Sequence, residues 1–433
     1  MLLYAHTLTP RLRYITHWFA EQFLFDSIEC TDSIDQYRAH TGLCINYSKE
    51  RIRDTECWIQ AATLLFESDI HPIQLDVQQN GTFSTFFCGR GDMGFDVFAA
   101  SFYLISRYEE YLPHPSDAYG RFSHDASLAF QHGFLDRPIV DQWMQQFCLC
   151  LQSKFPELVI RPIEFTHLAT YDIDESFAYQ HKPVWLQAAG LLRDIILFRL
   201  AWVRERVAVW LNQRPDPYDS FEFIRSLHVN TSTRPLVFIL MAEQRGQYDK
   251  NLSPQHPAQA QLIRSLSSWS DLALHPSWRS GDEPELLIKE KQQLQALIGR
   301  PIRASRQHYI RFRLPTTYRL LVEAGLQADY SMGYGSINGF RAGTARSFFW
   351  YDLAREQVST LCIHPFCYME ANSFYELGQG IEEAANDWTA LEGQIRQYGG
   401  TMITVWHNTF LGTQARFSGW RERYANWFRG LCN

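Results

Sequence analysis

The sequence lacks several features that would assign it to a common class of protein. It has no long run of Lys or Arg, and its formal net charge is -7 over 433 residues. Because nucleic-acid phosphates require concentrated positive charge, this pattern argues against nucleic acid as the main ligand. The nine cysteines include no Cys-x-x-Cys pair, and neither Cys148-x-Cys150 nor Cys362-x4-Cys367 has the spacing of a zinc finger.

The sequence also lacks a secretory signal and a long uninterrupted apolar run. With no cleavable leader pattern and no disulfide pattern, we expect a protein of the reducing cytoplasm. The longest apolar stretch, Trp185 to Leu211, contains six charged residues, so we expect no transmembrane segment. The stretch predicts one amphipathic helix. This helix packs on a neighbouring core or, alternatively, lies against a membrane surface or a partner.

Length and composition predict a folded protein of more than one domain. The chain exceeds an ordinary single domain, and 46% of its residues are hydrophobic. Aromatic residues make up 15%, with 13 Trp, 21 Tyr and 30 Phe, which suits well-packed cores and also the stacking surfaces of carbohydrate sites. We expect a smaller α+β domain over residues 1–155 and a second domain over 156–433, with a helical insertion near 185–212.

Apolar strand-like runs alternate with helical patterns in the second domain. This alternation predicts an α/β fold with parallel strands and crossover helices. The expected strands cover residues 163–171, 235–241, 271–275, 326–332 and 401–407. The expected helices cover residues 186–212, 257–269, 283–298, 315–325 and 381–398.

The segment Thr170-Tyr171-Asp172-Ile173-Asp174 ends the first of these strands with two carboxylates. Residues i and i+2 of an extended segment face the same way, so Asp172 and Asp174 can converge on one divalent cation or divide the roles of base and ligand. Polar clusters also follow the later strands, around Asp249, His275, His308 and His407. Because active groups of such sheets gather where strands end, the clusters together favour a catalytic site.

Five segments in this order carry a family resemblance. They are Thr170–Asp174, Leu274-His275-Pro276-Ser277, Arg306-Gln307-His308-Tyr309, Asp329-Tyr330-Ser331-Met332-Gly333-Tyr334 and Gly339-Phe340-Arg341-Ala342-Gly343-Thr344. The stretch from about residue 165 to 412 resembles the polysaccharide deacetylase, or NodB-homology, superfamily of carbohydrate esterases. It is most similar to a Bacteroidetes-type branch in which an uncharacterised amino-terminal domain precedes the barrel. The resemblance implies an irregular (β/α) barrel and a metal-dependent hydrolase.

The resemblance also implies roles for individual residues. Asp172 matches the catalytic base, Asp174 and His275 match metal ligands, and His407 matches the catalytic acid. The family motif carries a second histidine four residues after the first, but Arg279 stands at that position here. His308 is therefore the expected substitute ligand.

Further residues are expected to orient the base or to contact the substrate. Arg306 matches an arginine that orients the catalytic aspartate. Arg341 can hold an anionic sugar or, with equal weight, close a structural salt bridge. Trp278 and Tyr309 are the expected aromatic contacts to substrate.

The expected cofactor is one divalent ion, zinc first, with cobalt, manganese or nickel as alternatives. The expected substrate is an acetylated sugar or polysaccharide, from which an N- or O-acyl group is removed. Two other interpretations stay open. The missing second histidine suggests a catalytically impaired protein that binds glycan or a partner, and the Asp172-x-Asp174 spacing alone suggests a glycosyltransferase. The last requires a nucleotide-binding βα unit, and the first 169 residues have no glycine-rich turn of that kind.

Overall fold

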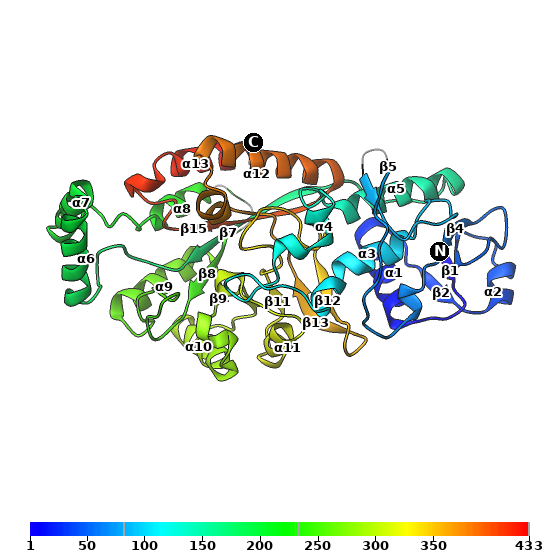
Figure 1. Cartoon of the computed structure of the whole chain (residues 1–433), viewed down its shortest axis with the longest axis horizontal. Helices are drawn as coiled ribbons and strands as arrows, with labels where there is room; N and C mark the ends of the chain where they lie inside the picture. Colours follow the sequence, from blue (N-terminus) through cyan, green and yellow to red (C-terminus); the bar gives the residue numbers. More distant parts are fainter. Residues whose placement is uncertain (81–82, 230, 232–233, 432–433) are drawn as a thin grey trace. The chain divides into compact units, whose positions relative to one another are not determined.

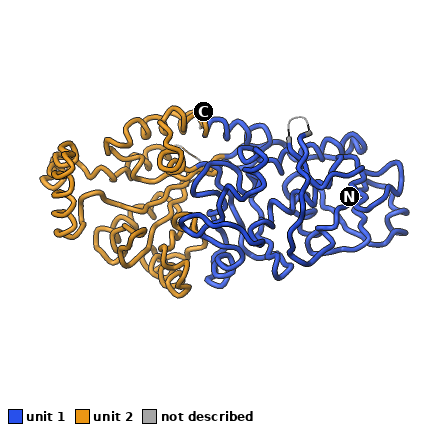
Figure 2. Tube along the Cα trace, in the orientation of Figure 1, with its two compact units in different colours: residues 1–166, 312–368, 388–402 blue, residues 167–311, 369–387, 403–433 orange. Residues whose placement is uncertain are grey.

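The computed structural model describes residues 1–80, 83–229, 231 and 234–431. The chain forms two compact units (Figure 2). Unit 1 contains residues 1–166, 312–368 and 388–402, and unit 2 contains residues 167–311, 369–387 and 403–433. The chain therefore passes between the units several times. The single boundary near residue 155 stays a prediction.

The first segment of unit 1 contains a four-stranded parallel sheet in the order β2-β1-β3-β4. Its strands are β1 (Leu2–Tyr4), β2 (Glu29–Thr31), β3 (Cys44–Ser48) and β4 (Cys57–Gln60). Parallel strands need crossovers, which here are α1 (Pro10–Phe23) and α2 (Ile34–Ala39). This parallel sheet is typical of α/β folds, and the α+β class of residues 1–155 stays a prediction.

The rest of unit 1 adds helices and a second group of strands. The helices are α3 (Val97–Ile105), α4 (Leu128–Gln131), α5 (Ile139–Lys154) and α11 (Thr316–Glu323). β12 (Phe348–Asp352) pairs antiparallel with β13 (Gln357–Ile363), and β13 pairs parallel with β11 (Ala328–Asp329). A small antiparallel pair joins β5 (Gln78–Asn80) and β6 (Phe83–Thr85).

Unit 2 is built on parallel strands, as the sequence predicts. β7 (Phe165–Ile173) pairs parallel with β8 (Leu236–Leu240), β8 with β9 (Asp271–His275), and β9 with β10 (Ala304–Ser305). β15 (Gly400–His407) follows on the other side of β7, and β14 (Tyr368–Met369) follows β15. The α/β class is thereby confirmed.

Helices connect these strands, as Figure 1 shows. Unit 2 contains α6 (Val184–Ile196), α7 (Leu200–Trp210), α8 (Phe221–Leu227), α9 (Pro257–Trp269), α10 (Pro284–Ile298) and α13 (Trp420–Leu431). α12 (Ile381–Tyr398) begins in unit 2 and ends in unit 1. The bounds of α9 and α12 coincide with the predicted ranges. No helix among the described residues is long and apolar enough to cross a membrane.

The single helix predicted over residues 186–212 is wrong. The chain forms two helices, α6 and α7, which are separated at Leu197–Arg199. Phe198 adopts a left-handed conformation (φ 52°), which an α-helix does not accommodate. The segment therefore turns back on itself as a hairpin.

Candidate metal centre

The candidate site lies at the carboxyl ends of the parallel strands of unit 2. Asp172 is the next-to-last residue of β7, and Asp174 directly follows that strand. His275 is the last residue of β9, while Arg306 and His308 follow β10. Since parallel strands end at one edge of a sheet, these three polar segments are brought together there.

Three imidazoles converge on the Asp174 carboxylate. The Nε2 atom of His275 lies 3.2 Å from Oδ1 of Asp174, and the Nε2 atom of His308 lies 3.4 Å from Oδ2. The Nε2 atom of His407 lies 3.5 Å from the same Oδ2. The three residues predicted as metal ligands are thus gathered in one place, with candidate donor atoms within 4.8 Å of one another.

The outer nitrogen of each histidine has a separate acceptor. Nδ1–H of His275 donates to the backbone carbonyl of Arg306 (2.5 Å), and Nδ1–H of His308 donates to Asp249 (2.9 Å). Nδ1–H of His407 donates to Oε1 of Glu370 (2.7 Å). This pattern fixes the orientation of each ring, so that Nε2 faces Asp174, where it can bind an ion when deprotonated or carry a proton when protonated.

Asp172 lies beside this group and is held by Arg306. Nη1 of Arg306 donates to Oδ1 of Asp172 at 2.7 Å, and both side chains are almost fully buried. The Arg306 guanidinium also stacks over the ring of Phe238, 4.1 Å from its centroid. The second oxygen of Asp172 is 3.8 Å from Nε2 of His275. Arg306 therefore fixes the orientation of the Asp172 carboxylate: Oδ1 is bound to the guanidinium, and Oδ2 faces the candidate site.

The charges of the site shift the pKa values of three of its members. Burial alone would raise the pKa of Asp174, but the surrounding imidazoles, His308 foremost, hold it well below its usual range. Burial alone would lower the pKa of His308, but Asp174 and Asp249 raise it to about 9. Glu370 and then the two aspartates overcome burial at His407 and raise its pKa to about 10.

This donor set fits a divalent metal ion. Two imidazole nitrogens and one carboxylate oxygen are the ligand types that catalytic zinc sites combine with an open position. The Asp174 side chain is 27% exposed, whereas the side chains of His275 and His308 are 2% and 3% exposed. Solvent can therefore approach the cluster from the Asp174 side. The hydrogen-bonded outer nitrogens supply the orientation that such sites require.

An aromatic group lies next to His308. The Trp278 ring stacks on Tyr248 (3.9 Å between centroids, 24° between planes), and Tyr309 meets both rings edge-on. Tyr309 also contacts the ring of His308 at 4.7 Å. The two predicted aromatic contacts, Trp278 and Tyr309, are thus together beside the site, and Tyr248 adds a third ring.

Arg341 belongs to unit 1 and is not among these residues. Its Nε and Nη2 donate to the Glu110 carboxylate at 2.8 and 2.6 Å, and its Nη1 donates to the carbonyl of Gly333 at 2.9 Å. The side chains of Arg341 and Glu110 are 1% and 2% exposed. This is the salt bridge considered from sequence. A substrate contact at Arg341 stays a prediction that this arrangement does not favour.

Two residues of the site were given no role from sequence. Glu370 directly follows β14, a strand too short to be recognised from sequence. Asp249 lies in a polar loop, and the sequence does not distinguish it from the other polar residues of that loop. Only their long-range partners, His407 and His308, distinguish them. Arg279, which stands where the family has a histidine, forms an exposed ion pair with Glu283 at 2.8 Å.

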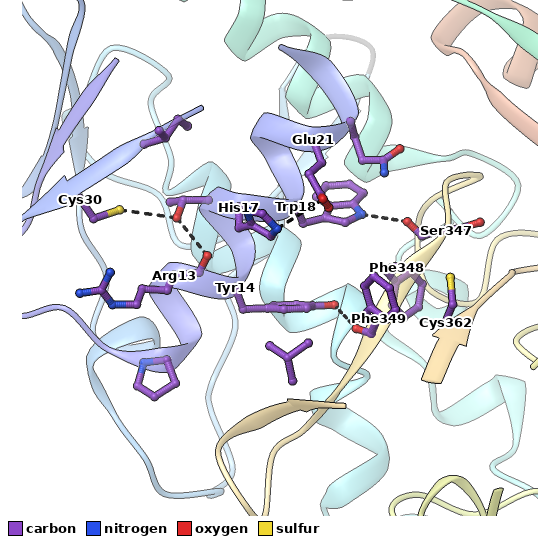
Figure 3. Close-up of a pocket in the computed structure, with 15 residues that line it drawn as sticks. Arg13, Tyr14, His17, Trp18, Glu21, Cys30, Ser347, Phe348, Phe349 and Cys362 are labelled. Carbon is purple, nitrogen blue, oxygen red and sulfur yellow. Dashed lines mark hydrogen bonds and ion pairs between the residues drawn. The ribbon is translucent and has the colours of Figure 1, made fainter. Parts of the chain in front are cut away.

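Unit 1 contains a separate cavity of about 630 Å³ between α1 and the β12–β13 pair (Figure 3). Tyr14 and Trp18 of α1 donate hydrogen bonds to the carbonyls of Phe349 and Ser347 across it. Its lining is mainly apolar, and its closest acid–imidazole contact, His17 with Glu21, is solvent-exposed. Nothing in it resembles the convergent donors around Asp174.

Few known proteins are similar to this chain. Residues 1–156 match a family model described as a family of unknown function (DUF7033). No curated protein matches the chain. A solved structure, "Crystal structure of putative polysaccharide deacetylase from Mycobacterium smegmatis", shares 14% identity with a TM-score of 0.40, and the alignment covers 62% of this chain and 85% of that chain.

Proposed function

We propose that the protein is a metal-dependent hydrolase of the polysaccharide deacetylase type, with an irregular (β/α) barrel over residues 156–433. It removes an N- or O-acetyl group from a glycan or glycan precursor. One observation carries the proposal: three imidazole Nε2 atoms lie 3.2–3.5 Å from the oxygens of Asp174, and each Nδ1 has its own acceptor. A cluster oriented in this way suits an ion better than it suits a buried salt bridge.

The ion would be held by Asp174, His275 and His308. When bound, it supplies Lewis-acid polarisation of the acyl carbonyl and a water whose pKa falls from ~15.7 toward ~7. Imidazole and carboxylate ligands fit zinc first, with cobalt, manganese and nickel as alternatives.

The remaining residues move protons. Asp172 accepts the proton of the attacking water, and Arg306 keeps its carboxylate aimed at that water. As the bond between the acyl carbon and the sugar nitrogen or oxygen breaks, His407 donates its Nε2 proton to the departing atom. The products are acetate and the free amine or hydroxyl. The raised pKa of His407 keeps that proton available at neutral pH.

Trp278, Tyr248 and Tyr309 form the proposed sugar-binding wall. Aromatic rings present large flat apolar faces together with a polar edge, which suits the alternating character of a pyranose. Their contact with His308 places this wall directly beside the proposed ligands.

Metal content tests the site. The purified protein should carry about one equivalent of a divalent ion after loosely bound ions are removed, and His275→Ala and His308→Ala should each lose it. Arg279→Ala is the matched control, because this exposed side chain pairs only with surface groups. An unloaded wild type, even after incubation with zinc, cobalt, manganese or nickel, would make the impaired, binding-only interpretation the leading one.

Turnover tests the reaction. Release of acetate from acetylated sugars by the loaded wild type, but not by Asp172→Asn that retains metal, supports the assignment. Tight binding of a nucleoside diphosphate, with no acetate release from any acetylated sugar, would instead revive the glycosyltransferase interpretation.

A further inference from the structure

The α6–α7 hairpin of unit 2 has its apolar side chains outside. Figure 1 shows the two helices side by side in green. Across α6 and α7 the buried residues are Asp194, Glu205, Arg206 and Val209. Eleven of the 22 exposed large hydrophobic side chains of the described residues lie between residues 184 and 211. Phe198 at the tip is 86% exposed and Trp185 is 71% exposed.

Charged groups fill the interior of the hairpin instead. Nη2 of Arg206 donates to Asp194 at 2.8 Å, and both side chains are almost fully buried. Gly190 allows this approach, because a Cβ there would lie 2.9 Å from the Arg206 guanidinium. Arg206 also stacks over Tyr179 at 4.5 Å. Polar contacts thus hold the two helices together, and no part of the chain that the structure describes covers the apolar face.

A basic cavity of about 520 Å³ opens against the inner side of the hairpin. Seven basic side chains line the cavity, and one acidic side chain does so. The acidic residue is Glu175, which follows Asp174 in the chain. The basic residues are Lys182, Arg193, Arg199, Arg206, Arg245, Lys250 and Arg416. Among the residues that the structure describes, Arg199, Arg245, Lys250 and Arg416 form no ion pair with a carboxylate. The cavity therefore has unneutralised positive charge.

The hairpin is basic in a chain that is acidic as a whole. Residues 182–214 contain six basic and two acidic side chains, a net charge of +4, whereas the whole chain carries -7. Exposed Trp, Phe, Leu and Ile next to Arg and Lys are the combination by which interfacial helices bind anionic membranes.

We propose that the α6–α7 hairpin docks on an anionic phospholipid bilayer. Its apolar face enters the boundary between headgroups and acyl chains, and the exposed arginines of the hairpin, Arg193, Arg199 and Arg204, bind lipid phosphate. This docking is independent of the metal site. It would bring the site beside glycans or glycan precursors that are attached to a membrane.

A second copy of the chain is the less suitable occupant. Two hairpins facing each other would bury their apolar faces, but each carries a net charge of +4 over residues 182–214. Like charges across an interface oppose association, whereas anionic headgroups neutralise the same side chains.

Vesicle flotation tests the proposal with the full-length protein. The wild type should float with phosphatidylcholine vesicles that contain phosphatidylglycerol and should stay unbound with phosphatidylcholine alone. The double variant Trp185→Ser/Phe198→Ser should reduce binding at least about tenfold, because it removes the most exposed apolar area. Arg199→Gln/Arg204→Gln should reduce it about tenfold through lost charge.

Two controls separate the alternatives. Phe25→Ser removes a side chain that is 58% exposed in unit 1 and should leave flotation unchanged. His275→Ala should also float normally, so a failed metal assignment leaves this test intact. Absence of flotation with phosphatidylglycerol vesicles would overturn the proposal. So would a solution dimer that Phe198→Ser dissociates, because the apolar face would then belong to a second copy.

Discussion

One oxygen of Glu370 accepts two hydrogen bonds from His407, from the backbone N–H at 2.6 Å and from the imidazole Nδ1–H at 2.7 Å. Glu370 has no exposed surface, so this pair fixes both the end of β15 and the orientation of the proposed acid. A carboxylate in this position acts through the imidazole rather than on substrate.

Replacement of Glu370 should therefore slow turnover without removing the metal. We expect Glu370→Gln to lower kcat about 10- to 100-fold, because the imidazole loses its fixed tautomer and orientation. Steady-state kinetics with an acetylated sugar, together with metal content, measures this. Glu376→Gln is the control, because this exposed side chain ends the short helix Asn372–Glu376. Unchanged kcat in Glu370→Gln would exclude a positioning role.

Asp249 should matter for metal affinity. It accepts from Nδ1–H of His308 and from the backbone N–H of Trp278, so it orients a proposed ligand and the aromatic wall together. We expect Asp249→Asn to weaken metal binding about 10- to 100-fold. Competition with a chelator measures the change. The exposed Asp271→Asn, at the start of β9, should behave as wild type.

The Arg341–Glu110 pair should be a determinant of stability. Arg341 is one of two guanidinium groups that pair with the buried Glu110 carboxylate, the other being Arg107 at 2.7 Å, so Arg341→Met should lower the free energy of unfolding by about 1–3 kcal/mol. Urea denaturation measures this. Arg279→Met breaks an exposed pair and should cost less than about 1 kcal/mol. A raised KM with unchanged stability in Arg341→Met would assign the residue to substrate instead.

His167 and His228 should make the protein less stable in mild acid. Burial, and for His167 the neighbouring His228, lowers their pKa values to about 3 and about 4. Both are therefore neutral in the folded protein and become protonated after unfolding below about pH 6.5, so their contribution to stability is lost as pH falls from 7 to 5. The raised pKa values of His308 and His407 act in the opposite direction over the same range. His167→Gln should reduce that loss by about 1 kcal/mol. Equal pH dependence in variant and wild type would contradict this.

The regular elements of unit 2 could be predicted where local signals agree with the fold. α9 begins at Pro257, directly after a capping His256 whose side chain accepts from the backbone N–H of Ala258, and both features are visible in the sequence. β8 and β9 are short apolar runs between helical patterns. The break at Phe198 has no such signal, because neither glycine nor proline marks it. The position of this break depends on burial of the Asp194–Arg206 pair, which is a tertiary interaction.

Two of the candidate ligands, Asp174 and His275, could be predicted because each stands at the end of an apolar strand, and parallel strands end at one edge of a sheet. His308 follows β10, a strand of two residues that no apolar run marks, so it was expected only through the family resemblance. Glu370 and Asp249 depend on partners 37 and 59 residues away in the chain, and no periodicity links such pairs. At Arg341 the sequence suggested a substrate contact as one possibility, because the arginine stands between glycines, but in the structure it forms a buried salt bridge.

The interleaving of the two units has a consequence for biosynthesis. Asp174, His275 and His308 are translated well before His407, which belongs to the last segment of unit 2. A nascent chain on the ribosome therefore presents the three donors without the final strand and without Glu370 to orient it. Folding of unit 2 can be completed only late in translation, and ion acquisition before that point would take place in an open, unshielded site.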